Sequence, residues 1–557
     1  MNFLSISFWA AFCAFFLIYI FVRKWSRTAM LLWVLAFDLF FFWQANGWLM
    51  LLLPATAAVN YLLTEAVRRN KYGGISPEPP AASSPFPTLP AQSLGAGRSA
   101  DADFAALKLP PTADTATPAP AAAEPSPSGN TGSASTTPTH STRQPHPGPH
   151  SRHARPDRAS HRKLLLALII LLDLAALVYF KYSGFFVEGI LNPLLKSNFA
   201  VGDIVLPIGI SFYTFQAISY SVDVYRGKYT GRPDFLEFCF YLSFFPLLLA
   251  GPITRAGRFL PQIRRAEPAT RHELRLGLWL IILGLLKKGV LADYLAVYNN
   301  LAFDSPVSYS GYELLMAVIG YTMQIYLDFS GYSDLSIGIA SLMGFRLDVN
   351  FRFPYRSLNL TEFWRRWHIS LSTWFRDYVY IPLGGNRKGE ARTLLNNFLT
   401  MVVAGLWHGS TWMFVLWGAL HGAGLAVHKL CRGWLKKIPD TWPVKALSWL
   451  LTMAFVAGCW VLFRAASLQD AGEIFRRIFT DFDLAYFAPF WAARKLWCVV
   501  LAVAAAGLLI PPRAYDRLQA RFTRLPWIVI FVVFLLAVQL VIQLRIGDIQ
   551  PFIYYQF

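Results

Sequence analysis

Hydrophobic residues are arranged along this chain in long uninterrupted runs rather than at alternating positions. Residues 1–22 carry no charged side chain, and the segments 446–463 and 527–544 are uncharged throughout. Comparable apolar runs lie near 29–45, 48–64, 163–180, 204–221, 236–250, 276–298, 312–327, 396–415, 416–430 and 494–510. A helix needs about 20 apolar residues to cross a bilayer, and backbone groups in lipid must be satisfied internally. The pattern therefore predicts an all-α polytopic membrane protein of about 11–13 helical segments, some of them re-entrant or interfacial.

The composition agrees with a lipid environment. Hydrophobic residues make up 55% of the chain and charged residues 15%, with a mean hydropathy of +0.39. Soluble proteins carry about 25% charged residues, so an ordinary soluble enzyme is excluded. The first run lacks a preceding basic stretch and is followed by Arg23, Lys24 and Arg27. These features predict a membrane helix that is not cleaved off and whose amino end lies on the outer side of the membrane. The lipid bilayer is therefore one expected partner of the protein.

The net charge of +19 is distributed as a membrane topology requires. Basic residues gather mostly in gaps between apolar runs, at 23–27, 68–71, 152–163, 226–232, 255–275, 346–392, 429–437 and 513–524. The positive-inside rule assigns these gaps to the cytoplasm, so no nucleic-acid partner is expected. The five cysteines stand singly without a CxxC pair, which predicts neither a disulfide framework nor a metal site.

Residues 73–160 interrupt the membrane pattern. They hold 17 of the 35 prolines but only two aromatic residues, Phe86 and Phe104. Such a segment cannot bury enough apolar surface to fold, so we predict a disordered cytoplasmic insertion between the third and fourth membrane segments. The chain then divides into amino-terminal transmembrane helices at 1–72, the insertion at 73–160, a core at 161–470 and carboxyl-terminal transmembrane helices at 471–557.

The segment 346–395 is too polar to span a membrane but is rich in aromatic residues. Read at helical period, one face carries Trp364, Trp367, Leu371, Trp374 and Tyr378. This periodicity predicts an amphipathic helix lying in the membrane interface, with the tryptophans as an aromatic anchor. An anchor does not account for His368 within the same turn.

His408 is the most informative ionisable residue of the membrane runs. It lies in the apolar stretch 399–417, where such a side chain is costly and is a functional candidate. A neutral buried imidazole can accept a proton near pH 7, but a histidine hydrogen-bonded between helices fits the residue type equally well. Gly405 and Gly409 flank it and permit close approach of another backbone or a substrate. For His421 we favour a helix-packing contact.

Other polar residues near this region have simpler interpretations. Structural ion pairing is expected for most of the carboxylates Asp328, Asp334, Asp348, Glu362 and Asp377. His272 and His428 lie beside basic clusters and are expected to be solvated. The glycine-rich tract 383–389 with Arg387 has the composition of a phosphate cradle and equally of an ordinary turn.

Six long motifs carry a family resemblance. The segments 326–345, 359–387 and 395–422 resemble the membrane-bound O-acyltransferase family, in the branch of the alginate O-acetylation and teichoic-acid D-alanylation proteins. The segments 206–227, 244–255 and 286–296 extend the similarity, which runs from about 163 to 467. The resemblance implies a funnel-like helical fold. It also implies that His408, in GLWHG, is catalytic and that His368, in WRRWH, is a second important histidine.

The resemblance further implies a reaction. Similar proteins move an acyl group from a cytoplasmic thioester, acetyl-CoA or another donor, across the membrane toward an external hydroxyl, without a permanently bound cofactor. O-acetylation of an exported, alginate-like bacterial polysaccharide at the inner membrane is the expected role. Arg365, Arg366 and Arg387 are candidates for the donor phosphates. Polysaccharide export machinery and a periplasmic or membrane-anchored acetyltransferase of the SGNH or esterase-like type are the expected partners.

Two alternatives stay open at this point. One is D-alanyl transfer to a cell-wall polymer from a carrier protein. The other is a non-enzymatic lipid or glycan transporter, against which the polar, histidine-bearing segment 346–395 argues.

Overall fold

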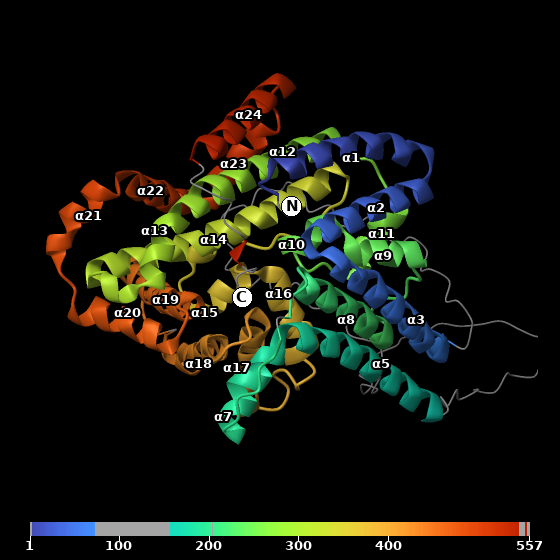
Figure 1. Ribbon diagram of the computed structural model, residues 1–557, viewed down its shortest axis with the longest axis horizontal. Coiled ribbons are helices and arrows are strands. Elements are labelled where there is room, and N and C mark those ends of the chain that lie inside the picture. The colour runs from blue at the N-terminus through green and yellow to red at the C-terminus, as the bar shows by residue number, and fades with distance from the viewer. Residues whose placement is uncertain (1–2, 73–155, 203, 436, 545–551, 554–557) are drawn as a thin grey trace, which may run out of the picture. The chain divides into compact units, whose positions relative to one another are not determined.

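The computed structural model describes residues 3–72, 156–202, 204–435, 437–544 and 552–553. Every regular element in these residues is a helix (Figure 1). The predicted insertion lies outside the described residues except for its last five positions, which belong to α5 (Pro156–Leu177). Its histidines, from His140 to His153, lie outside them as well.

The helices follow the predicted apolar runs. In the first part of the chain they are α1 (Ile6–Trp25), α2 (Arg27–Asn46), α3 (Leu52–Tyr72), α5, α6 (Ser183–Phe186), α7 (Asn192–Leu195), α8 (Ile210–Arg226), α9 (Phe235–Ser243), α10 (Phe245–Ala250), α11 (Ala256–Arg265), α12 (Arg271–Leu285) and α13 (Asp293–Asp304). They continue with α14 (Gly311–Leu342), α15 (Leu360–Arg366), α16 (Ile369–Phe375), α17 (Glu390–His408), α18 (Trp412–Leu435), α19 (Trp442–Arg464), α20 (Leu468–Thr480), α21 (Phe487–Ala493), α22 (Lys495–Leu509), α23 (Pro512–Phe522) and α24 (Trp527–Leu544). Short π or 3-10 turns join several of them, at η1 (Gly47–Leu51), η2 (Val178–Tyr182), η3 (Val187–Leu191), η4 (Leu286–Ala292), η5 (Pro306–Ser308), η6 (Pro354–Arg356), η7 (Arg376–Tyr380) and η8 (Leu484–Tyr486).

Six of the described helical segments are long and apolar enough to cross a membrane. They are Ile6–Trp25, Arg27–Arg69, Ser160–Leu195, Trp412–Leu435, Trp442–Arg464 and Trp527–Leu544. A seventh would be the pair Leu484–Ala493 and Lys495–Leu509, which is bent by 99°. The other predicted runs are also helical but are shorter or more polar. The multi-pass, all-α class predicted from the sequence is therefore confirmed for the described residues.

Three helices begin in capping boxes that the sequence encodes. Asp234 precedes α9, Thr270 precedes α12 and Ser310 precedes α14, each followed three residues later by a glutamate. In each box the cap side chain accepts from the third helical N–H, and the glutamate accepts from the backbone of the cap. These bonds satisfy amide groups that have no partner within the helix, so they determine where each helix begins.

The long helix α14 runs through the bundle and packs against α10, α12, α13, α19 and α20 (Figure 1). Its contact with α12 is a close approach of glycines. A Cβ atom on Gly284 would lie 2.7 Å from the carbonyl oxygen of Gly331, and one on Gly277 would lie 2.8 Å from that of Gly338. Within each helix the two glycines are seven residues apart, which places them on the same face of that helix. Small residues therefore bring these two backbones together, as in other membrane bundles.

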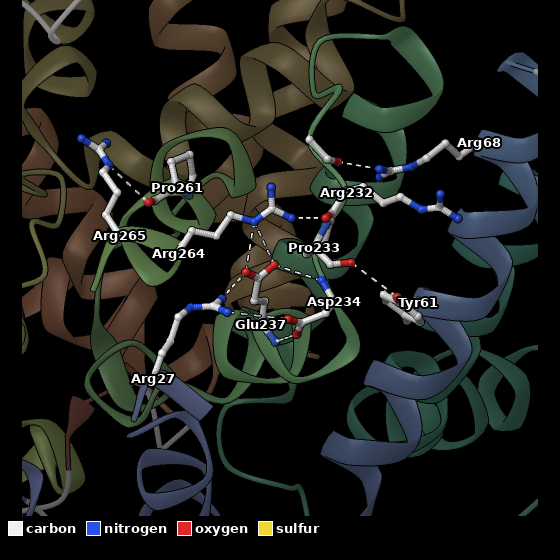
Figure 2. A network of polar contacts seen from close by, with 11 residues as sticks. Arg27, Tyr61, Arg68, Arg232, Pro233, Asp234, Glu237, Pro261, Arg264 and Arg265 are labelled. Atoms are coloured by element: carbon white, nitrogen blue, oxygen red, sulfur yellow. Dashed lines mark hydrogen bonds and ion pairs between the residues drawn. The ribbon is translucent and has the colours of Figure 1, made fainter. Parts of the chain in front are cut away.

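Basic clusters that are distant in sequence meet at one end of α9 (Figure 2). The buried Glu237 pairs with Arg27 of α2, and both of its oxygens accept from Arg264 Nε of α11 at 3.0 Å. Arg68 of α3 donates to the carbonyl oxygen of Gly231, and Arg264 donates to that of Arg232. Four of the predicted cytoplasmic clusters thus lie together, as the positive-inside rule requires of loops on one side of a membrane.

Candidate active site

His408 is the last residue of α17, at the point where the chain turns back into α18. Glycines allow the two helices to approach closely: a Cβ on Gly405 would lie 2.2 Å from the carbonyl oxygen of Phe414, and one on Gly418 would lie 2.3 Å from that of Met401. A Cβ on Gly409 would lie 2.1 Å from the Phe414 ring. The glycines beside His408 therefore allow a neighbouring backbone and side chain to approach closely. Of the two alternatives expected for them, another backbone or a substrate, the structure shows the first.

Aromatic rings enclose the His408 imidazole, whose residue is only 3% exposed. Trp407 and Trp417 lie with their ring centroids 5.0 Å from it, and Phe463 of α19 lies at 5.5 Å. This surrounding excludes bulk water from the imidazole. Exclusion of water suits an acyl-transfer site because water would hydrolyse the donor.

The carboxyl end of α17 is anchored by η2, the π-helical turn that follows α5. Lys181 Nζ donates to the carbonyl oxygens of Trp407 at 2.8 Å and His408 at 2.9 Å. The Tyr182 hydroxyl donates to the carbonyl oxygen of Leu406 at 2.7 Å. The last carbonyls of a helix lack partners within it and carry the negative end of its dipole, so a lysine is favourable here. This contact was not predicted from the sequence. Lys181 directly follows the predicted apolar run 163–180, and an ionisable residue in that place was a signal that could have been used.

The predicted amphipathic helix containing Trp364, Trp367, Leu371, Trp374 and Tyr378 is wrong as a single element. The chain forms α15, then a break at Trp367–His368, then α16 and the π-helical turn η7. His368 adopts the left-handed backbone conformation with φ +41°. The break occurs because backbone groups on either side of it form hydrogen bonds outside the helix. Ile369 N donates to the carbonyl oxygen of Asn350 at 2.9 Å, and Arg352 N donates to that of Arg366 at 3.0 Å. Period counting cannot detect such bonds, since it assumes a continuous helix.

This break turns His368 into the protein core rather than toward a membrane interface. Its exposed fraction is 0%, and its ring lies 4.6 Å from that of Phe329 in α14. Trp407 lies 6.1 Å from the His368 ring and 5.0 Å from the His408 ring, measured between centroids. The structure therefore brings both candidate histidines, 40 positions apart in the chain, to the same tryptophan.

The remaining histidines differ in their surroundings. His421 of α18 is buried, and its Nδ1 accepts from Trp364 Nε1 at 3.3 Å, in agreement with the predicted packing contact. His272 is exposed, as expected. The prediction that His428 is solvated is wrong: it is half-buried, with its Nδ1 3.0 Å from Thr361 Oγ1. Its place on α18, facing α15, explains the difference.

The five carboxylates near the site are ion-paired, which confirms the structural interpretation. The pairs are Asp328 with Lys288, Asp334 with Lys287, Asp348 with Arg258, Glu362 with Arg366, and Asp377 with Arg376. Among the described residues, no group of three or more His, Cys, Asp or Glu side chains is placed to hold a metal ion.

The basic donor-site candidates are spread over two elements. Arg365 is exposed on α15, and Arg366 beside it is half-buried against Glu362. Arg387 is exposed in the turn before α17, which Asn396 holds by donating to the carbonyl oxygen of Gly385 at 2.9 Å. Their contact with a donor stays a prediction.

Known proteins share the part of the chain that carries this site. The profile of the membrane-bound O-acyltransferase family matches residues 229–468. A probable alginate O-acetylase of Pseudomonas aeruginosa is 41% identical over 327 residues, covering 58% of this chain and 61% of that protein. A peptidoglycan O-acetyltransferase of Helicobacter pylori is 36% identical over 343 residues, covering 57% and 65%. A teichoic acid D-alanyltransferase of Bacillus subtilis is 27% identical over 268 residues, covering 46% and 68%.

The chain spans less than two thirds of the length of the first two of these relatives. Both His368 and His408 lie within the matched region. Residues 229–468, which hold both histidines, therefore match the membrane-bound O-acyltransferase family.

Proposed function

We propose that this protein is a membrane-bound O-acyltransferase that moves acetyl groups from a cytoplasmic thioester toward an exported cell-surface polysaccharide. The observation that carries the proposal is the buried His408, which shares Trp407 with His368 inside the family's matched region. The relatives with 36% and 41% identity are named for O-acetylation of peptidoglycan and alginate, which supports acetyl as the group transferred.

The chemistry needs only a proton acceptor and a dry site. The neutral His408 imidazole takes the proton of the acceptor hydroxyl while the hydroxyl oxygen attacks the thioester carbonyl carbon. The C–S bond then breaks, an ester forms, and the leaving thiolate recovers the proton from the imidazolium. The thioester is a substrate, so the reaction requires no resident cofactor. Burial of His408 among Trp417 and Phe463 keeps water from competing with the hydroxyl.

The finer assignments follow from the family resemblance and the charge pattern. We place the protein in the bacterial inner membrane, with Arg365, Arg366 and Arg387 on the cytoplasmic side for the phosphates of acetyl-CoA. A periplasmic or membrane-anchored acetyltransferase of the SGNH or esterase-like type would pass the group to the polymer beside the export machinery. D-alanyl transfer is the second candidate, favoured by the similarity to the Bacillus subtilis enzyme.

Transfer from a labelled donor by purified protein tests the proposal. His408→Ala removes the proton acceptor, so turnover is expected to fall about 100-fold or more while donor binding persists. His421→Ala is the matched control, because it removes another buried histidine that bonds to Trp364. That control is expected to lower stability by roughly 1–3 kcal/mol without selectively removing turnover.

The comparison requires detergent-solubilised yield, melting temperature and transfer from the same preparations. A well-folded His408→Ala protein with near-normal transfer would return His408 to a packing role. Offering acetyl-CoA and a D-alanyl carrier protein in parallel separates the two donor classes. Failure of the wild-type protein to transfer either group would refute the acyltransferase assignment and favour a transporter.

A further inference from the structure

The amide oxygen of Asn350 is the centre of a buried cluster behind His368. Asn350 Oδ1 lies 2.9 Å from Ser370 Oγ, 3.3 Å from Ser370 N and 3.1 Å from His368 Nδ1. Asn350 is 1% exposed and Ser370 is 6% exposed. The cluster is therefore shielded from water, so water does not compete for its hydrogen bonds.

The backbone of Ser370 determines the orientation of the amide. A backbone N–H can only donate, so the Asn350 atom that faces it must be the oxygen and not the nitrogen. The amide nitrogen lies on the other side, where it is 3.3 Å from Ser333 Oγ of α14. Both ends of the Asn350 amide thus have partners that suit their chemistry.

This orientation in turn determines which nitrogen of His368 carries the proton. Because the amide oxygen only accepts, the nearby Nδ1 must donate to it. A neutral imidazole has one N–H, so the lone pair then resides on Nε2. The backbone supports this arrangement, since Ile369 N donates to the carbonyl oxygen of Asn350 and keeps His368 in its left-handed conformation.

We propose that Asn350 is a positioning residue that holds His368 in the Nδ1–H tautomer and makes Nε2 its proton-accepting nitrogen. His368 and His408 both adjoin Trp407, so we expect the orientation of the His368 ring to affect turnover at the site. The effect on turnover rests on the proposed acyl transfer, whereas the tautomer itself can be measured without any substrate.

Nitrogen-15 NMR of ring-labelled histidine tests the tautomer, because protonated and unprotonated ring nitrogens resonate far apart. The His368 signals are assigned by their loss in His368→Gln. The wild-type protein is expected to show the proton on Nδ1. Asn350→Leu removes the acceptor and is expected to lose that preference, with kcat lowered on the order of 100-fold and the KM for the donor little changed. Asn350→Asp keeps an acceptor oxygen and is expected to restore the Nδ1–H signal and most of the turnover.

A matched control separates positioning from packing. Asn299 of α13 is also fully buried, and its amide donates to Gln324 Oε1 of α14 at 2.8 Å. Asn299→Leu is expected to lower the melting temperature but to leave the His368 signals unchanged. A wild-type proton on Nε2, or unchanged kcat in a folded Asn350→Leu protein, overturns the proposal. If the wild-type protein transfers no acyl group, the proposed function fails, and the ring spectra alone decide the tautomer.

Discussion

Replacing Lys181 by methionine tests whether the anchor at the end of α17 supports the site. Methionine has a similar length and flexibility but no hydrogen-bond donor. The substitution therefore removes the bonds from Nζ to the carbonyl oxygens of Trp407 and His408. The Tyr182 bond to Leu406 is retained, so one of the three hydrogen bonds described between η2 and the end of α17 remains.

The expected cost can be worked from these contacts. A hydrogen bond involving a charged group contributes about 1.5–3 kcal/mol, and Lys181 makes two of them to adjacent carbonyls. Part of this loss is offset, because the variant no longer has to remove an ammonium group from water. A net destabilisation of about 2 kcal/mol is therefore expected. Turnover is expected to fall as well, because the carbonyl oxygen of His408 loses its hydrogen bond from Lys181.

Thermal denaturation of the detergent-solubilised protein, measured beside acyl transfer, checks both effects. Lys196→Met is the matched control, since Lys196 follows α7 and is exposed. Lys181→Arg retains a cationic donor and is expected to recover part of the stability. If Lys181→Met melts at the wild-type temperature and turns over normally, the anchor does not support the site and the reasoning is refuted.

Three further predictions concern the organisation of the chain. Deleting residues 80–155, whose composition cannot form a core, is expected to leave membrane insertion and acyl transfer intact; loss of membrane-integrated protein would contradict this. Lys388→Cys in a cysteine-free background is expected to resist an impermeant thiol reagent in spheroplasts, and labelling from outside would reverse the proposed topology. Gly284→Ala is expected to destabilise the fold by about 1–3 kcal/mol, because its Cβ would lie 2.7 Å from the Gly331 oxygen. Gly472→Ala in α20 has open space around it and is expected to be neutral or slightly stabilising, as melting curves of the two variants would reveal.

The sequence by itself determined the class of protein and singled out a candidate for its chemical centre. Apolar runs predict helices because both membrane crossing and helical hydrogen bonding depend on residues that are close in the chain. His408 could be singled out as a candidate for the same reason, since an ionisable side chain inside an apolar run has a local cost. The ion pairing of Asp328 and Asp334 could be predicted in the same way, because removing a carboxylate from water is costly unless it has a partner.

Only the tertiary structure decided how the site is assembled. The hydrogen bond from Lys181 to the His408 carbonyl joins residues 227 positions apart. The contact of Asn350 with His368 depends on the break between α15 and α16, which the spacing of apolar residues does not predict. The aromatic spacing of 364–378 is compatible with one helix. Backbone hydrogen bonds with residues 350–352 replace the helical hydrogen bonds at His368, so the helix breaks there. Such contacts depend on which distant segments pack together. They are therefore properties of the folded bundle and not of any local stretch of sequence.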